Sequence, residues 1–142
     1  MNLTHNNNAY IELFLHIKKL IEKAYIVSKG KKPNSGHFPA MSAACEYMGY
    51  ISCQDSSKSP TRIAYNDDLK ERLENKLEGT IGQHSGPDHY VIGGCAEQVA
   101  ANDVMRNIET NPNIPDLTFT EAFQPRTMKM RDWCNNCHQV FD

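Results

Sequence analysis

The sequence lacks the segments that would place a chain in a membrane or direct it through one. No apolar run approaches the roughly 20 residues that a membrane-spanning helix needs. The first residues, Met1-Asn2-Leu3-Thr4-His5, lack the basic start and the apolar stretch of a secretory signal. Internal repeats are also missing, which excludes a repeat architecture. The chain as it stands is therefore expected to be soluble.

The chain also lacks a strong net charge. It has 15 Lys and Arg against 17 Asp and Glu, so its formal charge of −2 gives no global sign of nucleic-acid binding. The charges are nevertheless unevenly distributed, because basic residues gather at 18–32 and 126–131 and acidic residues gather at 67–78. Solvated helix faces usually explain such runs, and a surface that follows a phosphate backbone is the alternative.

Apolar periodicity predicts the first half of the chain. With 142 residues, 39% of them hydrophobic, the chain has enough apolar material for one modest core. Apolar residues recur at helical spacing from Tyr10 to Val27, with asparagines ahead as caps and Gly30 behind as a stop. Two extended runs, from about Phe38 to Tyr47 and from Tyr50 to about Gln54, flank a Met48-Gly49 turn and predict antiparallel strands.

The second half predicts an α/β unit, because strands and helices alternate. Strands linked through helices favour a partly parallel sheet, with a site at the strand C-terminal ends beside helix N-termini. The expected elements are a short helix after Asn66, a glycine-rich loop at 79–86, a helix at 95–108, a strand ending before Pro125 and a helix beginning at Cys134.

Two of the five cysteines, Cys45 and Cys53, fall in the predicted hairpin. A turn at Met48-Gly49 pairs Cys45 with Ser52 and places Cys53 on the opposite face of the sheet. A disulfide between the two cysteines is not expected in that register. They are interpreted as buried thiols of a reduced compartment.

The other three cysteines accompany a glutamate in an order typical of a catalytic zinc site. Cys95-Ala96-Glu97 precedes Cys134-Asn135-Asn136-Cys137, and each segment opens a predicted helix. Activation of water at zinc needs three protein ligands, one open coordination position and a carboxylate that does not bind the metal. Helix N-terminal dipoles also lower thiol pKa values and favour the thiolates that bind zinc.

The strings GGCAEQVAA and WCNNC together resemble the motif pair of the cytidine deaminase-like superfamily. Within it, they are most similar to the compact deaminase domains of bacterial polymorphic toxins, such as the YwqJ-type families. The resemblance implies an α/β fold with three α/β/α layers and a small mixed sheet. Residues 1–142 would form a single deaminase domain, with an N-terminal helix within 1–30 and a catalytic core over 38–142.

The same resemblance implies the chemistry of the site. Cys95, Cys134 and Cys137 would hold Zn²⁺, and Glu97 would carry protons while zinc-activated water converts cytosine to uracil in DNA or RNA. Nucleic acid and an immunity protein are the implied partners, with no membrane attachment and a monomeric state. The domain would act in the cytoplasm of a target cell after delivery as part of a larger secreted protein.

Six further residues are candidates for supporting the metal or binding substrate. Arginines could offset the negative charge of zinc with three thiolates by donating hydrogen bonds to sulfur, and ordinary exposed side chains are the alternative. Aromatic residues beside the cysteines could stack a base or pack in the core. A polar loop before the first strand could contact sugar or base. These candidates are Arg126, Arg131, Tyr90, Trp133, Asn34 and His37.

Two other functions fit the same motifs. One is a deaminase of free nucleosides or nucleotides, and the other is a non-catalytic zinc-stabilised binding module, in which His89 could supply a fourth ligand. Cys134 to His138 also form a haem-attachment string, which would leave Cys95 and Glu97 unexplained. Glu97 discriminates between the enzyme and the module, because a structural zinc site has no use for an unliganded carboxylate.

Overall fold

The computed structural model describes residues 1–142 and contains four α-helices and eight β-strands. The helices are α1 (Asn7–Val27), α2 (Asp67–Leu77), α3 (Ala96–Asn107) and α4 (Asn135–Phe141). The strands are β1 (Asn2–Leu3), β2 (Ser42–Tyr47), β3 (Tyr50–Asp55), β4 (His84–Ser85), β5 (Tyr90–Val91), β6 (Thr118–Phe119), β7 (Ala122–Gln124) and β8 (Lys129–Arg131). Short 3₁₀ turns lie at Ser35–His37, Pro60–Arg62 and Ile114–Asp116.

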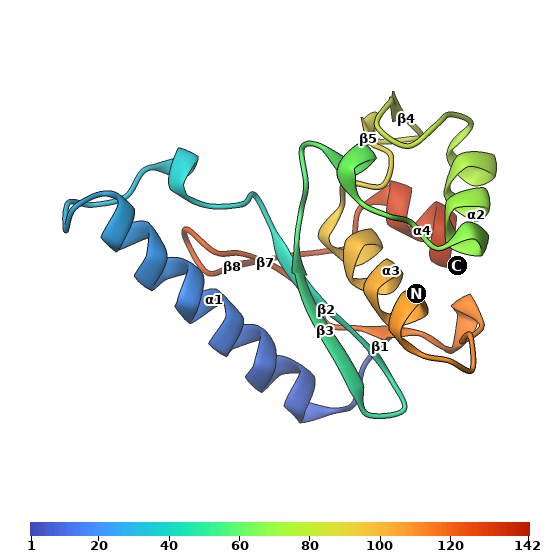
Figure 1. Ribbon diagram of the computed structural model, residues 1–142, viewed down its shortest axis with the longest axis horizontal. Coiled ribbons are helices and arrows are strands. Elements are labelled where there is room, and N and C mark those ends of the chain that lie inside the picture. Colours follow the sequence, from blue (N-terminus) through green and yellow to red (C-terminus); the bar gives the residue numbers. More distant parts are fainter.

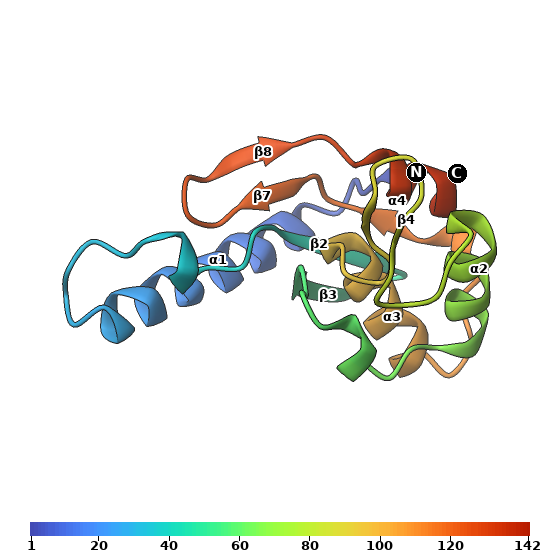
Figure 2. The same cartoon turned by 90° about the horizontal axis from the view of Figure 1, so that it is seen from above.

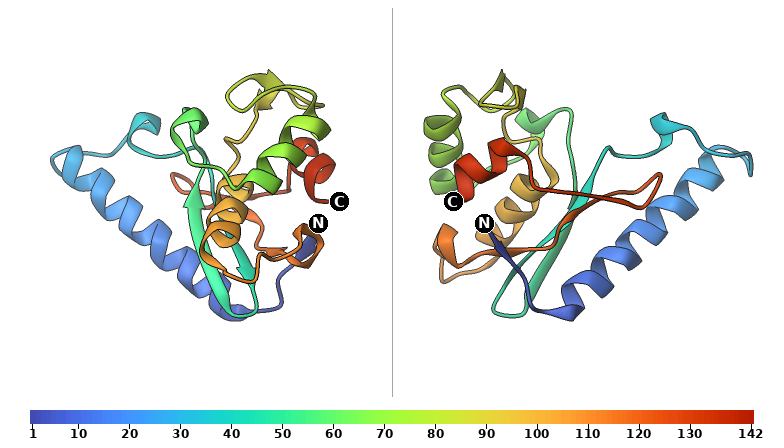
Figure 3. Two further views of the ribbon diagram at one scale, coloured as in Figure 1. Left: turned by 45° about the vertical axis from the view of Figure 1, so that its right-hand side comes forward. Right: turned by 180° about the vertical axis from the view of Figure 1, so that it is seen from behind.

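The elements form the three predicted layers. Helix α1 packs on one face of strands β2 and β3, and α3 packs on their other face (Figure 1). Helices α2 and α4 pack against each other on the outer side of α3, as both views in Figure 3 show. No helix is both long enough and apolar enough to cross a membrane.

The central hairpin has the predicted register. Strands β2 and β3 pair antiparallel, with Cys45 opposite Ser52 and Cys53 opposite Ala44. Cys45 and Cys53 are therefore on opposite faces of the sheet, as the Met48-Gly49 turn requires. Strand β2 is central, because its other edge pairs antiparallel with both β6 and β7.

The sheet is mixed, although its parallel part is not where the strand-helix alternation places it. The only parallel pair joins β1 to β6. Strands β3 and β6, which α2 and α3 connect along the chain, run in the same direction but are separated by β2. They are not hydrogen-bonded neighbours because the antiparallel strand β2 lies between them.

Separate apolar clusters hold the layers together. Leu13 and Ile17 of α1 are buried against Ala44 of β2, and Phe14 meets Phe123 edge-on with ring centroids 5.2 Å apart. Behind the sheet, the leucines of α2 pack with α3, α4 and Phe119 in a larger cluster. The α1 helix begins where the Asn6 side chain accepts a hydrogen bond from the Asn8 amide, as the asparagine caps predict.

Two hairpins were not expected from the sequence. Strand β4 lies within the segment 79–86 that was predicted to be a loop, and it pairs with β5 in a small separate sheet. Strands β7 and β8 pair through a turn that contains Met128 at φ 59°, so the basic stretch 126–131 forms half of a hairpin. Figure 2 shows this hairpin projecting to the same side of the molecule as the C-terminal half of α1.

Candidate metal centre

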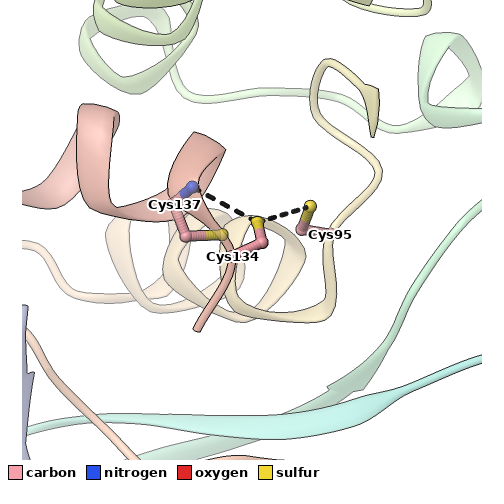
Figure 4. Close-up of side chains that lie close together, drawn as sticks. All are labelled: Cys95, Cys134 and Cys137. Carbon is pink, nitrogen blue, oxygen red and sulfur yellow. Dashed lines mark hydrogen bonds between the residues drawn. The ribbon is translucent and has the colours of Figure 1, made fainter. Parts of the chain in front are cut away.

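The structure brings together the three cysteines that the motifs single out. Cys95 caps the N-terminus of α3, Cys134 caps that of α4, and Cys137 lies in the first turn of α4. Their sulfur atoms all lie within 4.8 Å of one another (Figure 4). Residues far apart in the sequence thus converge because two helices begin at the same place.

The spacing of the sulfur atoms fits a metal ion. Zinc–sulfur bonds of about 2.3 Å at tetrahedral angles place two sulfur atoms about 3.8 Å apart. The Sγ atoms of Cys95 and Cys134 are 3.8 Å apart, far beyond the length of a disulfide bond. Three thiolates could therefore hold a tetrahedral ion and leave one position free, and no other His, Cys, Asp or Glu belongs to this group.

The local electrostatics favour one thiolate even without a metal. The pKa of Cys134 is lowered because its sulfur lies beside the thiols of Cys137 and Cys95 and accepts a hydrogen bond from the backbone amide of Cys137. The pKa of Cys137 is raised well above its ordinary value because its thiol lies beside the sulfur atoms of Cys134 and Cys95 and is fully buried. Cys134 is therefore the first sulfur to ionise, as expected for a helix N-terminus.

Glu97 lies beside the cysteines without joining them as a ligand. It is the second residue of α3, and one of its carboxylate oxygens accepts from the Cys137 thiol at 3.8 Å. Only 5% of the residue is exposed. Burial raises the pKa of Glu97 to about 7. A carboxyl group that exchanges its proton near neutral pH suits general acid-base chemistry.

An open pocket of about 1280 Å³ leads to this centre. Cys95, Glu97 and Cys134 are among its lining residues, whereas the fully buried Cys137 lies behind them. Residues 56–58, which follow β3, and Ala122, which follows β6, form part of the wall. The pocket thus lies beyond the C-terminal ends of these two strands, where open α/β sheets carry their sites.

The two residues between the α4 cysteines fasten the β4–β5 hairpin to the metal centre. The buried Asn136 side chain accepts from the Asp88 amide at 2.9 Å and donates to the Ser85 carbonyl at 2.9 Å. Asp88 in turn accepts from the backbone and side chain of Asn135. Gly86 permits the approach, because a Cβ there would lie 2.6 Å from the Asn136 amide oxygen.

A second buried amide supports Cys137 from α3. The Gln98 side chain donates to the Cys137 sulfur at 3.6 Å and accepts from the Gly93 amide at 2.9 Å. Donors to a ligand sulfur orient it and reduce its negative charge. Sequence analysis missed Gln98 and Asn136. The sequence shows each only as a polar residue in the first turn of a predicted helix, and the burial that gives them their roles is seen only in the structure.

Three of the predicted substrate contacts line the pocket. Tyr90, on the β4–β5 hairpin, is 52% exposed, and Arg131 at the end of β8 is also exposed. Trp133 lines the pocket while its indole N–H donates to the Thr120 carbonyl at 2.9 Å. The tryptophan ring also packs edge-on against Phe119. The packing interpretation of Trp133 is therefore confirmed, and stacking on a base stays a prediction.

The other candidates lie away from the pocket lining. The Asn34 backbone amide donates to the His37 ring, and the Asn34 side chain accepts from the Gly36 amide, so the two residues cap the Ser35–His37 turn outside the pocket lining. Arg126 is exposed near the turn between β7 and β8, and neither it nor Arg131 donates to a cysteine sulfur, which Gln98 does instead. His89 lies outside both the cysteine group and the pocket lining.

The chain was compared with protein-family models, curated proteins and solved structures, and none of the three comparisons gives a match.

Proposed function

We propose that this chain is a zinc-dependent nucleobase deaminase that converts cytosine to uracil in DNA or RNA. The observation that carries the proposal is the placement of Glu97, a buried carboxylate beside three convergent thiols at the end of an open pocket. A purely structural zinc site needs neither the carboxylate nor the pocket.

The chain's own residues account for the parts of such a reaction. Cys95, Cys134 and Cys137 would hold Zn²⁺, which when bound supplies the Lewis acidity that brings the ionisation of water into the neutral range. Glu97 would take one proton from the attacking water and pass it to the ring nitrogen of the base, and would then take the second proton from the added hydroxyl group and pass it to the amine, which leaves as ammonia. Gln98 and the α3 and α4 N-termini offset the charge of the thiolates.

The open shape of the pocket favours a substrate base that is attached to a larger molecule. It is lined by charged and aromatic side chains at an exposed rim, including Tyr90 and Arg131, rather than closed over the metal centre. We extend the proposal to a toxin domain that acts in a target-cell cytoplasm and is neutralised by an immunity protein. A free cytidine, which makes no contacts beyond the pocket, should be a poor substrate.

Deamination of a cytosine-containing oligonucleotide by the purified, zinc-loaded protein tests the proposal. Glu97→Gln keeps the size of the side chain but removes its basic oxygen, so it should abolish uracil formation while zinc content is retained. Glu109→Gln, at an exposed position, is the matched control and should remain active. Equal activity of both variants would contradict the mechanism, and loss of zinc from Glu97→Gln would favour the binding-module alternative.

A further inference from the structure

We propose that a basic wing beside the pocket binds the backbone of a single-stranded polynucleotide and leads it to the metal centre. The basic wing comprises residues 18–41 and 122–131, which are the C-terminal half of α1, the segment leading into β2, and the β7–β8 hairpin. The inference rests on the proposed function and adds to it the binding surface and the strandedness of the substrate.

The basic wing concentrates the positive charge of the chain. It holds nine of the 15 Lys and Arg and only one of the 17 acids, so its formal charge is +8 and that of the remaining residues is −10. All nine basic residues are exposed. They are Lys18, Lys19, Lys23, Lys29, Lys31, Lys32, Arg126, Lys129 and Arg131.

No acidic partner neutralises these groups. The ion pairs of the structure join Met1 and His138 to Asp142 and His16 to Asp55, and none includes a Lys or Arg of the basic wing. Nine unpaired cations on neighbouring segments repel one another and release counterions when a polyanion binds. Their field is therefore available to a phosphate backbone.

The basic wing is continuous with the pocket. Ala40 and Met41 at one end of the basic wing, and Met130 and Arg131 at the other, line the pocket that contains Cys95 and Cys134. Figure 2 shows the C-terminal half of α1 and the β7–β8 hairpin on one side of the molecule and α2 on the opposite side. The acidic run at 67–78 lies on α2 and its C-cap, so the two charge clusters lie on opposite sides of the molecule.

The depth of the reacting groups favours a single strand over a duplex. Glu97 is only 5% exposed and Cys137 is fully buried, so a base must enter the pocket to reach them. A paired base would first have to leave its stack at a cost of a few kcal/mol, which an unpaired base avoids. The exposed ring of Tyr90 at the rim could stack a neighbouring unpaired base.

Fluorescence anisotropy with zinc-loaded Glu97→Gln protein tests the basic wing without turnover. The probe is a fluorescein-labelled, cytosine-rich single-stranded DNA, with RNA of the same sequence in parallel. Lys31→Gln with Lys32→Gln should weaken binding roughly 25-fold at about 0.1 M salt and lower the log–log salt slope by about 1.4, because each phosphate contact contributes about 0.7. The matched control, Lys70→Gln with Lys76→Gln on α2, should bind like the parent.

Equal weakening in the two double variants would overturn the proposal, and so would preferential binding of the basic wing to anionic phosphatidylserine vesicles over either oligonucleotide. Tighter binding to the corresponding duplex would overturn the single-strand assignment. The proposed reaction fails separately: oligonucleotide binding that depends on Lys31 and Lys32, without any deamination by the wild type, would leave the surface standing and refute the enzyme.

Discussion

Replacement of Asn136 by alanine should loosen the attachment of the β4–β5 hairpin to the metal centre. The fully buried amide makes two hydrogen bonds of 2.9 Å, to the Asp88 N–H and the Ser85 carbonyl. A buried partner left unsatisfied costs about 1–3 kcal/mol, and because Ser85 and Asp88 are only half-buried, Asn136→Ala should lower the free energy of unfolding by about 2 kcal/mol. That is a large share of the roughly 5–15 kcal/mol by which domains are stable.

Asn135→Ala provides the matched control from the adjacent position. Its exposed side chain donates only to Asp88 at 3.1 Å, and the backbone bond from Asn135 to Asp88 remains in the variant. The expected loss is about 0.5–1 kcal/mol. Urea denaturation at a fixed excess of zinc measures both losses, and amide hydrogen exchange reports on the hairpin directly.

Exchange at residues 84–91 should accelerate in Asn136→Ala and stay near the wild-type rate in Asn135→Ala. Asn136→Ala should also hold zinc less tightly, because Asn136 lies between two of the proposed ligand cysteines in the first turn of α4. Equal unfolding free energies for the two variants, together with unchanged hairpin exchange, would refute the assignment of Asn136 as the fastening residue.

Two further predictions concern the thiols. Serine at Cys95, Cys134 or Cys137 should lower the zinc content in elemental analysis, whereas serine at Cys45 or Cys53 should leave one zinc per chain. Full retention of zinc by a Cys134→Ser, Cys137→Ser double variant would contradict the ligand set. In metal-free protein, Cys134 should be the first cysteine to be alkylated, and its rate should change little with pH around neutrality, because its lowered pKa keeps the thiol ionised there. Mass spectrometry that shows Cys95 or Cys137 modified first would contradict the hydrogen-bond arrangement.

The sequence was sufficient to predict the elements whose determinants are local. The Met48-Gly49 turn fixes the β2–β3 register, and the spacing of Leu13 and Ile17 fixes the buried face of α1. The helix starts at Cys95 and Cys134 were also predictable from their motifs, whereas the expectation that these two helix starts meet came from the resemblance of the motif pair. These features depend on neighbours in the chain.

The features that were missed depend on partners distant in the sequence. Asn136 is buried only because the hairpin containing Gly86 and Asp88 folds over it, and no nearby residue signals that contact. The placement of the sole parallel pair depends on Asn2 meeting Thr118 across almost the whole chain. Asn34 and His37 cap the Ser35–His37 turn, a role that the sequence did not reveal because polar loop residues and turn caps have the same composition.

Sequencing of DNA and RNA from bacteria that express the chain tests the central claim most directly. Wild-type protein should be toxic and leave C-to-T changes in DNA or C-to-U changes in RNA, because in the proposed function Glu97 and the three cysteines form the deaminase site. Glu97→Gln should remove both the toxicity and the changes. Nucleic acids left unaltered by a harmless wild-type protein that readily converts free cytidine to uridine would contradict the account and favour nucleoside deamination.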